Sequence, residues 1–423
     1  MRIQNIFISA VICFLAFSAL PILSEAANSN NSTQDNSDLR LELAKVSLYS
    51  ETGKLDAARK LIDKLKAKYP NNPQVLVAEA DLNLKLGNRG AGFVELNKAV
   101  ILDPGNEDIL DKQRSALLVQ GPFTSGGFDF RRTNEAFEQL ENFATQVTVS
   151  PSVSLELNVD NDHLYSREPL TRVNGSTENF AGDKQRGTFT LNKMFDSGDQ
   201  ASASIFANNN TPGAGAKYVR WDSTGSTALQ GDFHRPDWDY AQMVIGDGTK
   251  DDIRLERKQF ITNRIEATLG GGFNHYSLQD DFNAASAAAW DLNLGYTYPY
   301  QLSKNDQVTL GAYYDVDAEY FTDVDERTLG GVEYKPLPIQ SYEVHSLNVS
   351  ASKQLMTELY AEAYGGYGVD RFTGSNGPLF GGDMEYALMD NLGLQLRAFH
   401  GIMGGVKGSE KEDRLGASLK WRW

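Results

Sequence analysis

The sequence is poor in cysteine and histidine and has no surplus of positive charge. Its single cysteine, Cys13, lies in an apolar run near the N-terminus, and its five histidines stand far apart in the chain. No two histidines have the spacing of metal ligands, so we expect no metal site and no cofactor. The formal net charge of −16 argues against nucleic acid as a partner, because phosphate binding needs clustered Lys and Arg.

Sequence motifs of catalysis are also missing. The glycine-rich stretch 269–274 (LGGGFN) lacks the lysine and the helix that follow a phosphate-binding loop. No serine stands in the elbow motif of the hydrolases. Carboxylates are plentiful, so counting leaves a glycosidase pair open, but nothing in the sequence sets one acid apart. We therefore expect no catalytic residues and no enzymatic activity.

Only one long apolar run is present, at residues 6–23, directly after a basic start. Small residues and a polar, Asn- and Ser-rich stretch follow it. This order predicts a secretory signal peptide over residues 1–27 and a polar linker over 28–37. The alternative is a membrane anchor, although the run is at the short end for spanning a bilayer. Without 1–27 the chain has no cysteine, so burial or a closed backbone hydrogen-bond network must stabilise it.

Residues 39–72 and 73–106 are related by a 34-residue period. The apolar spacing within each unit is helical, a glycine permits a turn between two helices, and a proline ends the second helix. The matching residues are Gly53 and Gly87, Pro70 and Pro104, and Asn72 and Asn106. This unit resembles the tetratricopeptide repeat. We expect a periplasmic helical domain over 38–120 that serves as a docking surface, or else as a mere plug or spacer.

From about residue 144 the helical period gives way to alternation of apolar and polar residues, which is typical of half-apolar strands. Short and long connections take turns along the chain, as in outer-membrane barrels. We expect a linker over 121–143 and a transmembrane antiparallel β-barrel over 144–423. The strands number 14, or 16 if the stretch 234–250 hides two more. A soluble β-sandwich or lipocalin-like barrel is the alternative fold.

The two faces of these strands differ in chemistry. In 306–320 and 357–367, one face is apolar and the other carries tyrosines and carboxylates. Ionised carboxylates are costly in lipid, so the acidic faces should line a wet lumen. Residues 118–423 carry 26 basic and 42 acidic side chains, which gives this part all of the net negative charge. The lumen residues that we single out are Tyr313, Asp315, Asp317, Glu319, Glu358, Tyr360, Glu362 and Tyr364.

Tyrosines beside carboxylates combine flat apolar rings with hydrogen-bond acceptors. Sugar rings can stack on the former and donate hydroxyl groups to the latter. We therefore expect a path for a polysaccharide, preferably neutral or cationic. A solvated channel wall without a specific ligand is the equally open alternative.

The chain ends in RLGASLKWRW (414–423), in which apolar residues alternate with polar ones. The apolar side chains should face lipid while the last strand pairs with the first and closes the sheet. The ending also resembles the signal that the barrel-assembly machinery reads. The residues of this predicted signal are Gly416, Leu419, Trp421 and Trp423. The expected location is the outer membrane of a Gram-negative bacterium, in contact with its lipid.

The order of signal peptide, helical repeats and barrel resembles the exopolysaccharide exporters of the outer membrane, namely the poly-N-acetylglucosamine, Pel and cellulose export porins. That resemblance implies polysaccharide export through an electronegative lumen, with polymer-modifying or synthase partners docked on the repeats. The chain departs from these exporters in having only about two repeats. It is also similar to the surface lipoprotein assembly modifiers, which pair a short repeat domain with a 14-stranded barrel. A general diffusion porin is a third interpretation.

Overall fold

The computed structural model describes residues 33–51, 54–86, 89–150, 152–195, 198–208, 211–222, 224–262, 264–278, 282–303, 306–356, 358–389, 391–405 and 408–423. The predicted signal peptide (1–27) and the repeat glycines Gly53 and Gly87 lie outside these residues. Of the predicted polar linker, residues 33–37 belong to a helix.

Five helices precede the strands. They are α2 (Thr33–Glu51), α3 (Leu55–Lys68), α4 (Pro73–Lys85), α5 (Arg89–Leu102) and α6 (Glu107–Gln120). The bounds of α5 equal those of α3 displaced by the predicted 34-residue period. Asn72 caps α4 by accepting from Gln74 N and Val75 N, and Asn106 accepts from Ile109 N at the start of α6. The predicted all-α region is confirmed, and the repeated asparagine is explained by capping.

The helices from α4 to α6 share a small apolar core. Its buried members include Leu76, Ala80 and Leu84 of α4, Leu96 and Ala99 of α5, and Ile109 of α6. Among the helices in the described part of the chain, none combines the length and the apolar character needed to cross a membrane.

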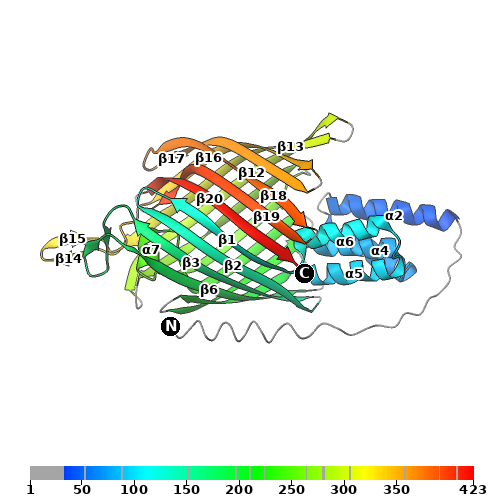
Figure 1. The fold of residues 1–423 in the computed structure, drawn as a ribbon, viewed down its shortest axis with the longest axis horizontal. Helices are drawn as coiled ribbons and strands as arrows, with labels where there is room; N and C mark the ends of the chain where they lie inside the picture. The colour runs from blue at the N-terminus through cyan, green and yellow to red at the C-terminus, as the bar shows by residue number, and fades with distance from the viewer. Residues whose placement is uncertain are drawn as a thin grey trace. The chain divides into compact units, whose positions relative to one another are not determined.

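Sixteen antiparallel strands form one closed barrel (Figure 1). In barrel order they are β1 (Phe123–Arg132), β2 (Ala136–Ser150), β3 (Val153–Ser166), β6 (Ala181–Met194), β7 (Gln200–Asn208), β8 (Pro212–Asp222), β9 (Gly225–Pro236), β10 (Thr249–Phe260), β11 (Ile265–Leu278), β12 (Phe282–Ser303), β13 (Asp306–Val324), β16 (Tyr342–Met356), β17 (Leu359–Asp370), β18 (Asn376–Met389), β19 (Leu392–Gly405) and β20 (Gly408–Arg422). Two small hairpins lie in long connections, β4 (Leu170–Thr171) with β5 (Thr177–Glu178) and β14 (Arg327–Leu329) with β15 (Val332–Tyr334).

The strand count is 16 for a reason different from the one predicted. Residues 121–143, expected to be a linker, contain β1 and the first half of β2. The stretch 234–250 holds no additional pair of strands and instead contains the short helix α7 (Ala241–Ile245). Strand β1 is hard to recognise because Gly126 and Gly127 interrupt its alternation of apolar and polar side chains.

The predicted closure of the sheet is confirmed. Strand β20 pairs with β1 from Phe123↔Arg422 to Arg132↔Asp413. Beyond the ladder, Trp423 N donates to Pro122 O at 3.1 Å. Closure gives the first and last strands of the sheet a hydrogen-bonding partner on both sides, which a sheet surrounded by lipid requires.

The outer face of the barrel is apolar. Leu415, Leu419, Trp421 and Trp423 of the last segment are about half exposed there, as predicted, at 58%, 48%, 51% and 49%. Phe128, Leu255, Leu269, Phe273, Leu347 and Phe380 continue the exposed apolar surface on other strands. So much exposed apolar surface suits lipid and not water, so the fold is a transmembrane barrel and the soluble alternatives are wrong.

Two residues of β11 offer a test of this outer face. Phe273 is exposed on the outer face between Ile253 and Ala288, whereas Thr268 pairs with Lys258 and Asn293 on the lumen side. Phe273→Arg should destabilise the folded barrel by about 2–4 kcal/mol, because arginine is costly in the bilayer core. Thr268→Arg should cost much less, since its charge reaches water. Guanidinium unfolding in lipid vesicles measures both, and equal losses would contradict the assigned faces.

Candidate functional site

The candidate functional site is the lumen of the barrel. The period of two places Tyr313, Asp315, Asp317 and Glu319 on one face of β13, opposite the exposed outer residues Leu310 and Tyr314. On β17, Glu362 and Tyr364 face the same lumen. Only β16 separates the two strands, so the two predicted faces lie close together on one wall.

A loop from the wall crosses this lumen. It consists of residues 237–248 between β9 and β10, includes α7, and is called here the inserted loop. Its Trp238 O accepts from Arg131 Nη2 of β1 at 3.0 Å, and its Tyr240 hydroxyl donates to Glu319 Oε2 of β13 at 3.0 Å. Strands β1 and β10 stand on opposite sides of the ring of 16 strands. The inserted loop therefore spans the lumen and obstructs it.

Glu319 is the acceptor that fixes the inserted loop on the β13 side. Besides the bond from Tyr240, its other oxygen accepts from the Tyr276 hydroxyl at 2.6 Å and from Asn274 Nδ2 at 2.6 Å. The side chain is only 4% exposed. The sequence predicts Glu319 on a polysaccharide path, but the structure buries it as an anchor of the loop. Charge-assisted hydrogen bonds of this kind are the strong ones.

Ion pairs hold the loop on its other sides. Lys250 Nζ lies 3.3 Å from Asp239 Oδ2, and Lys184 Nζ lies 2.8 Å from Asp247 Oδ1. The Arg186 guanidinium stacks on the Trp238 ring, 4.3 Å from its centroid. Burial, together with the neighbouring Asp239 carboxylate, raises the pKa of Asp237.

Apolar packing completes the closure at the end of the barrel that carries the long connections. Met243 packs with Tyr276 and with Leu337 and Ile339 of the connection after β15. Val244 and Ile245 pack with Leu164 and Leu170 in a second cluster. The two small hairpins also touch, because the Tyr334 hydroxyl donates to Val173 O at 2.9 Å. Figure 1 shows α7 and the β14–β15 hairpin at the same end of the barrel.

The other predicted lumen residues make local contacts. Asp315 accepts from Asn293 and, at 3.0 Å, from Asn348 Nδ2. The Tyr360 hydroxyl donates to Glu362 Oε2 at 3.3 Å. Asp317 is exposed on the lumen face of β13, whereas Glu358, predicted to lie on a strand, is exposed in the turn before β17. These residues form a wall and do not converge on one point, so no catalytic constellation is assembled by them.

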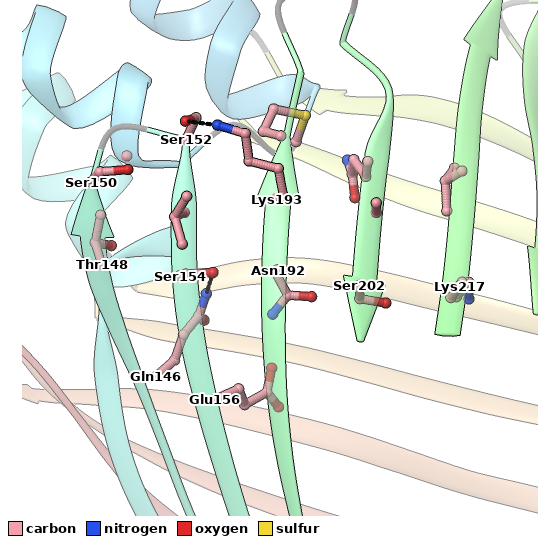
Figure 2. Close-up of a pocket in the computed structure, with 16 residues that line it drawn as sticks. Gln146, Thr148, Ser150, Ser152, Ser154, Glu156, Asn192, Lys193, Ser202 and Lys217 are labelled. Carbon is pink, nitrogen blue, oxygen red and sulfur yellow. Dashed lines mark hydrogen bonds between the residues drawn. The ribbon is translucent and has the colours of Figure 1, made fainter. Parts of the chain in front are cut away.

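A polar vestibule occupies the end of the lumen near the short turns. It has a volume of about 340 Å³ and is lined by β2, β3, β6, β7 and β8. Figure 2 shows its lining side chains, mostly hydroxyls and amides, among them Gln146, Thr148, Ser154, Asn192 and Ser202. These residues were not predicted from the sequence. The pattern that could have indicated them is the alternation of small polar residues with apolar ones, as in TFTLN (188–192) and ASASIF (201–206).

Pairs of opposite charge line a second cavity of about 500 Å³ beside the inserted loop. Arg131 Nε bonds Glu138 Oε2 at 2.5 Å, and Arg397 Nε bonds Asp129 Oδ1 at 2.8 Å. Asp129 lies against Gly416, where a Cβ would collide with the carboxylate. Gly416, a residue of the predicted assembly signal, thus has a packing reason for lacking a side chain. Neither pair was recognised from the sequence, because Asp129 and Arg397 lie 268 residues apart, while Arg131 and Glu138 fall in the stretch 121–143 that was expected to be a linker.

No protein-family model matches the chain, and no curated protein matches it. Solved structures are similar to it at low sequence identity. A bacterial polysaccharide outer membrane secretin is 11% identical over 71% of this chain and 98% of its own, with a TM-score of 0.49. OmpT of Vibrio cholerae is 9% identical over 71% and 96%, with a TM-score of 0.36. The channel DcaP of Acinetobacter baumannii is 12% identical over 71% and 96%, with a TM-score of 0.33.

The role of Glu319 can be tested by substitution. Glu319→Ala removes the hydrogen bond that holds the loop through Tyr240, together with those from Tyr276 and Asn274 of β11. Loss of the Tyr240 bond leaves a buried hydroxyl of the loop without its acceptor, which should weaken the seating of the loop by about 2–3 kcal/mol. Amide hydrogen exchange of residues 237–248 should then accelerate by about 30- to 150-fold. Glu385→Ala, at another lumen-facing carboxylate, is the control. Unchanged exchange in Glu319→Ala would show that the loop is held elsewhere.

Proposed function

We propose that this protein is an outer-membrane channel that carries a polysaccharide across the membrane. The observation that supports it best is a closed 16-stranded barrel with an apolar outer face and a hydrated, acid-rich lumen obstructed by one inserted loop. Such a wall provides a polar path through lipid, and a loop held by hydrogen bonds and ion pairs can be released to open it.

The chemistry of the wall favours a sugar polymer as cargo. The vestibule offers mostly hydroxyl and amide groups, which exchange hydrogen bonds with sugar hydroxyls, and its charged members, Glu156, Lys193 and Lys217, are of both signs. Further along, Tyr313, Tyr360 and Tyr364 stand beside Asp315 and Glu362. The resemblance of the domain order to the exopolysaccharide exporters supports export as the direction, with the helical repeats as the periplasmic docking surface.

A general diffusion porin is the second candidate, and the inserted loop favours it. A loop that narrows the lumen limits passage to small solutes unless it moves. The third interpretation, a surface lipoprotein assembly modifier, loses the support of its strand count, because the barrel has 16 strands and not 14.

Deletion of the gene separates these functions. We expect surface polysaccharide, stained on intact cells, to fall severalfold, with surface lipoproteins unchanged, because the channel is proposed to carry the polymer. Restoration by the intact gene is the control. Loss of surface lipoproteins instead would favour the assembly modifier, and loss of neither would favour the diffusion porin.

Conductance in planar bilayers tests the channel itself. Replacement of residues 238–247 by a short Gly-Ser linker should raise the single-channel conductance severalfold, since the lumen is then unobstructed. In that background, Asp315→Asn with Asp317→Asn should lower the preference for cations, because fewer carboxylates line the wall. Asp413→Asn, whose side chain pairs with His400 on the outer face, is the control. An unchanged conductance after loop replacement would contradict the obstruction.

A further inference from the structure

Two aromatic rings of the lumen wall lie against glycines. A Cβ at Gly381 of β18 would stand 2.6 Å from Cζ of Tyr364 on β17. A Cβ at Gly401 would stand 2.6 Å from Cζ of Phe399 on the same strand, β19. Real side chains do not approach so closely, so each ring occupies the space that a larger residue would need. The rings therefore lie along the wall, over these glycines.

The two rings belong to one row of the barrel. Gly381 is the register partner of Tyr364 on one side and of Phe399 on the other. Both aromatic side chains line the cavity of about 500 Å³ beside the inserted loop. This volume is within the range of about 300–1,000 Å³ that is usual for small-molecule sites. The row thus provides two aromatic side chains to a single cavity.

Charged groups of both signs stand beside these faces. Arg397 is the register partner of Asp383 and is bonded to Asp129, yet its side chain remains 52% exposed. The site therefore offers donors and acceptors together, with each arginine charge offset by a carboxylate. Such a set can donate to and accept from hydroxyl groups. It gives no excess of positive charge for an anionic ligand.

We propose that Tyr364, Phe399, Arg397 and Asp383 form a saccharide-binding subsite in the lumen for an uncharged pyranose segment. The apolar C–H faces of the sugar rings stack on Tyr364 and Phe399, and the hydroxyl groups bond Arg397 and Asp383. The glycines position the rings by leaving room for them against the wall. This inference rests on the proposed function and specifies where the lumen holds the polymer.

Calorimetric titration of the full chain in detergent with cellohexaose tests the subsite. Tyr364→Leu and Phe399→Leu should each weaken binding by about 10-fold, because leucine lacks the aromatic face. Gly401→Ala should also weaken it, since the atoms nearest its new methyl are Cδ2 of Leu379 and two ring carbons of Phe399, so that the methyl crowds the ring. Gly365→Ala is the matched control, because the atom nearest its Cβ is Leu379 O at 3.9 Å. Hexagalacturonate, which is anionic, should bind more weakly than cellohexaose.

Several results would overturn the subsite. They are no binding of cellohexaose by the unaltered chain, unaltered affinity in both leucine variants, equal loss in Gly365→Ala, or tighter binding of hexagalacturonate. Heat-modifiable gel mobility confirms that each variant is a folded barrel. The proposed function fails separately, if surface polysaccharide is unaffected by gene deletion while cellohexaose still binds at Tyr364 and Phe399. If gene deletion lowers surface polysaccharide but the affinity for cellohexaose is unchanged in both leucine variants, only the subsite is refuted.

Discussion

The antiparallel pairing of β1 with β20 is the interaction on which the rest of the structure depends. In lipid, an unpaired strand edge would leave a row of backbone N–H and C=O groups without hydrogen bonds, at several kcal/mol each. Closing the sheet removes both edges at once. It also fixes a single inside and a single outside, so that side chains are sorted by their position in each strand. The apolar outer face and the charged lumen are both consequences of that closure.

Inside the barrel, charged side chains are paired and aromatic side chains are placed where glycines leave room for them. Arginines and carboxylates stand as neighbours across strands, as in Arg131–Glu138 and Arg397–Asp129. Each charge is thereby offset, which the burial of Glu138 and Asp129 requires. The rings of Tyr364 and Phe399 lie over Gly381 and Gly401, which leave room for them at the wall. The rings therefore take less of the width of the lumen. The inserted loop then occupies the remaining width, held by Glu319 on one side and by basic side chains on the others.

Sequence alone predicted the kind of fold and the sorting of faces, because alternation with a period of two is a local property that strands such as β13 and β20 display clearly. It failed for β1 and β2, where glycines and outward polar residues such as Gln139 and Glu141 weaken the alternation. It assigned Glu319 to the lumen face and missed its burial, since Tyr240 and Tyr276 lie 79 and 43 residues away. The polar vestibule and the Arg397–Asp129 pair were missed because they are formed by strand order and register, which no single segment contains. The Arg131–Glu138 pair is local but was missed with the β1–β2 hairpin that contains it.

The long-range contacts of the inserted loop have a consequence for the order of assembly. Tyr240 finds its acceptor on β13, which follows it in the chain, whereas Arg131 of β1, which holds Trp238, precedes it by 107 residues. Contacts between distant segments form late, because the intervening chain must first be ordered. The loop therefore cannot reach its final position until most of the wall stands. A nascent barrel would pass through a stage in which its passage is still wide, and the seating of the loop is the step that narrows it.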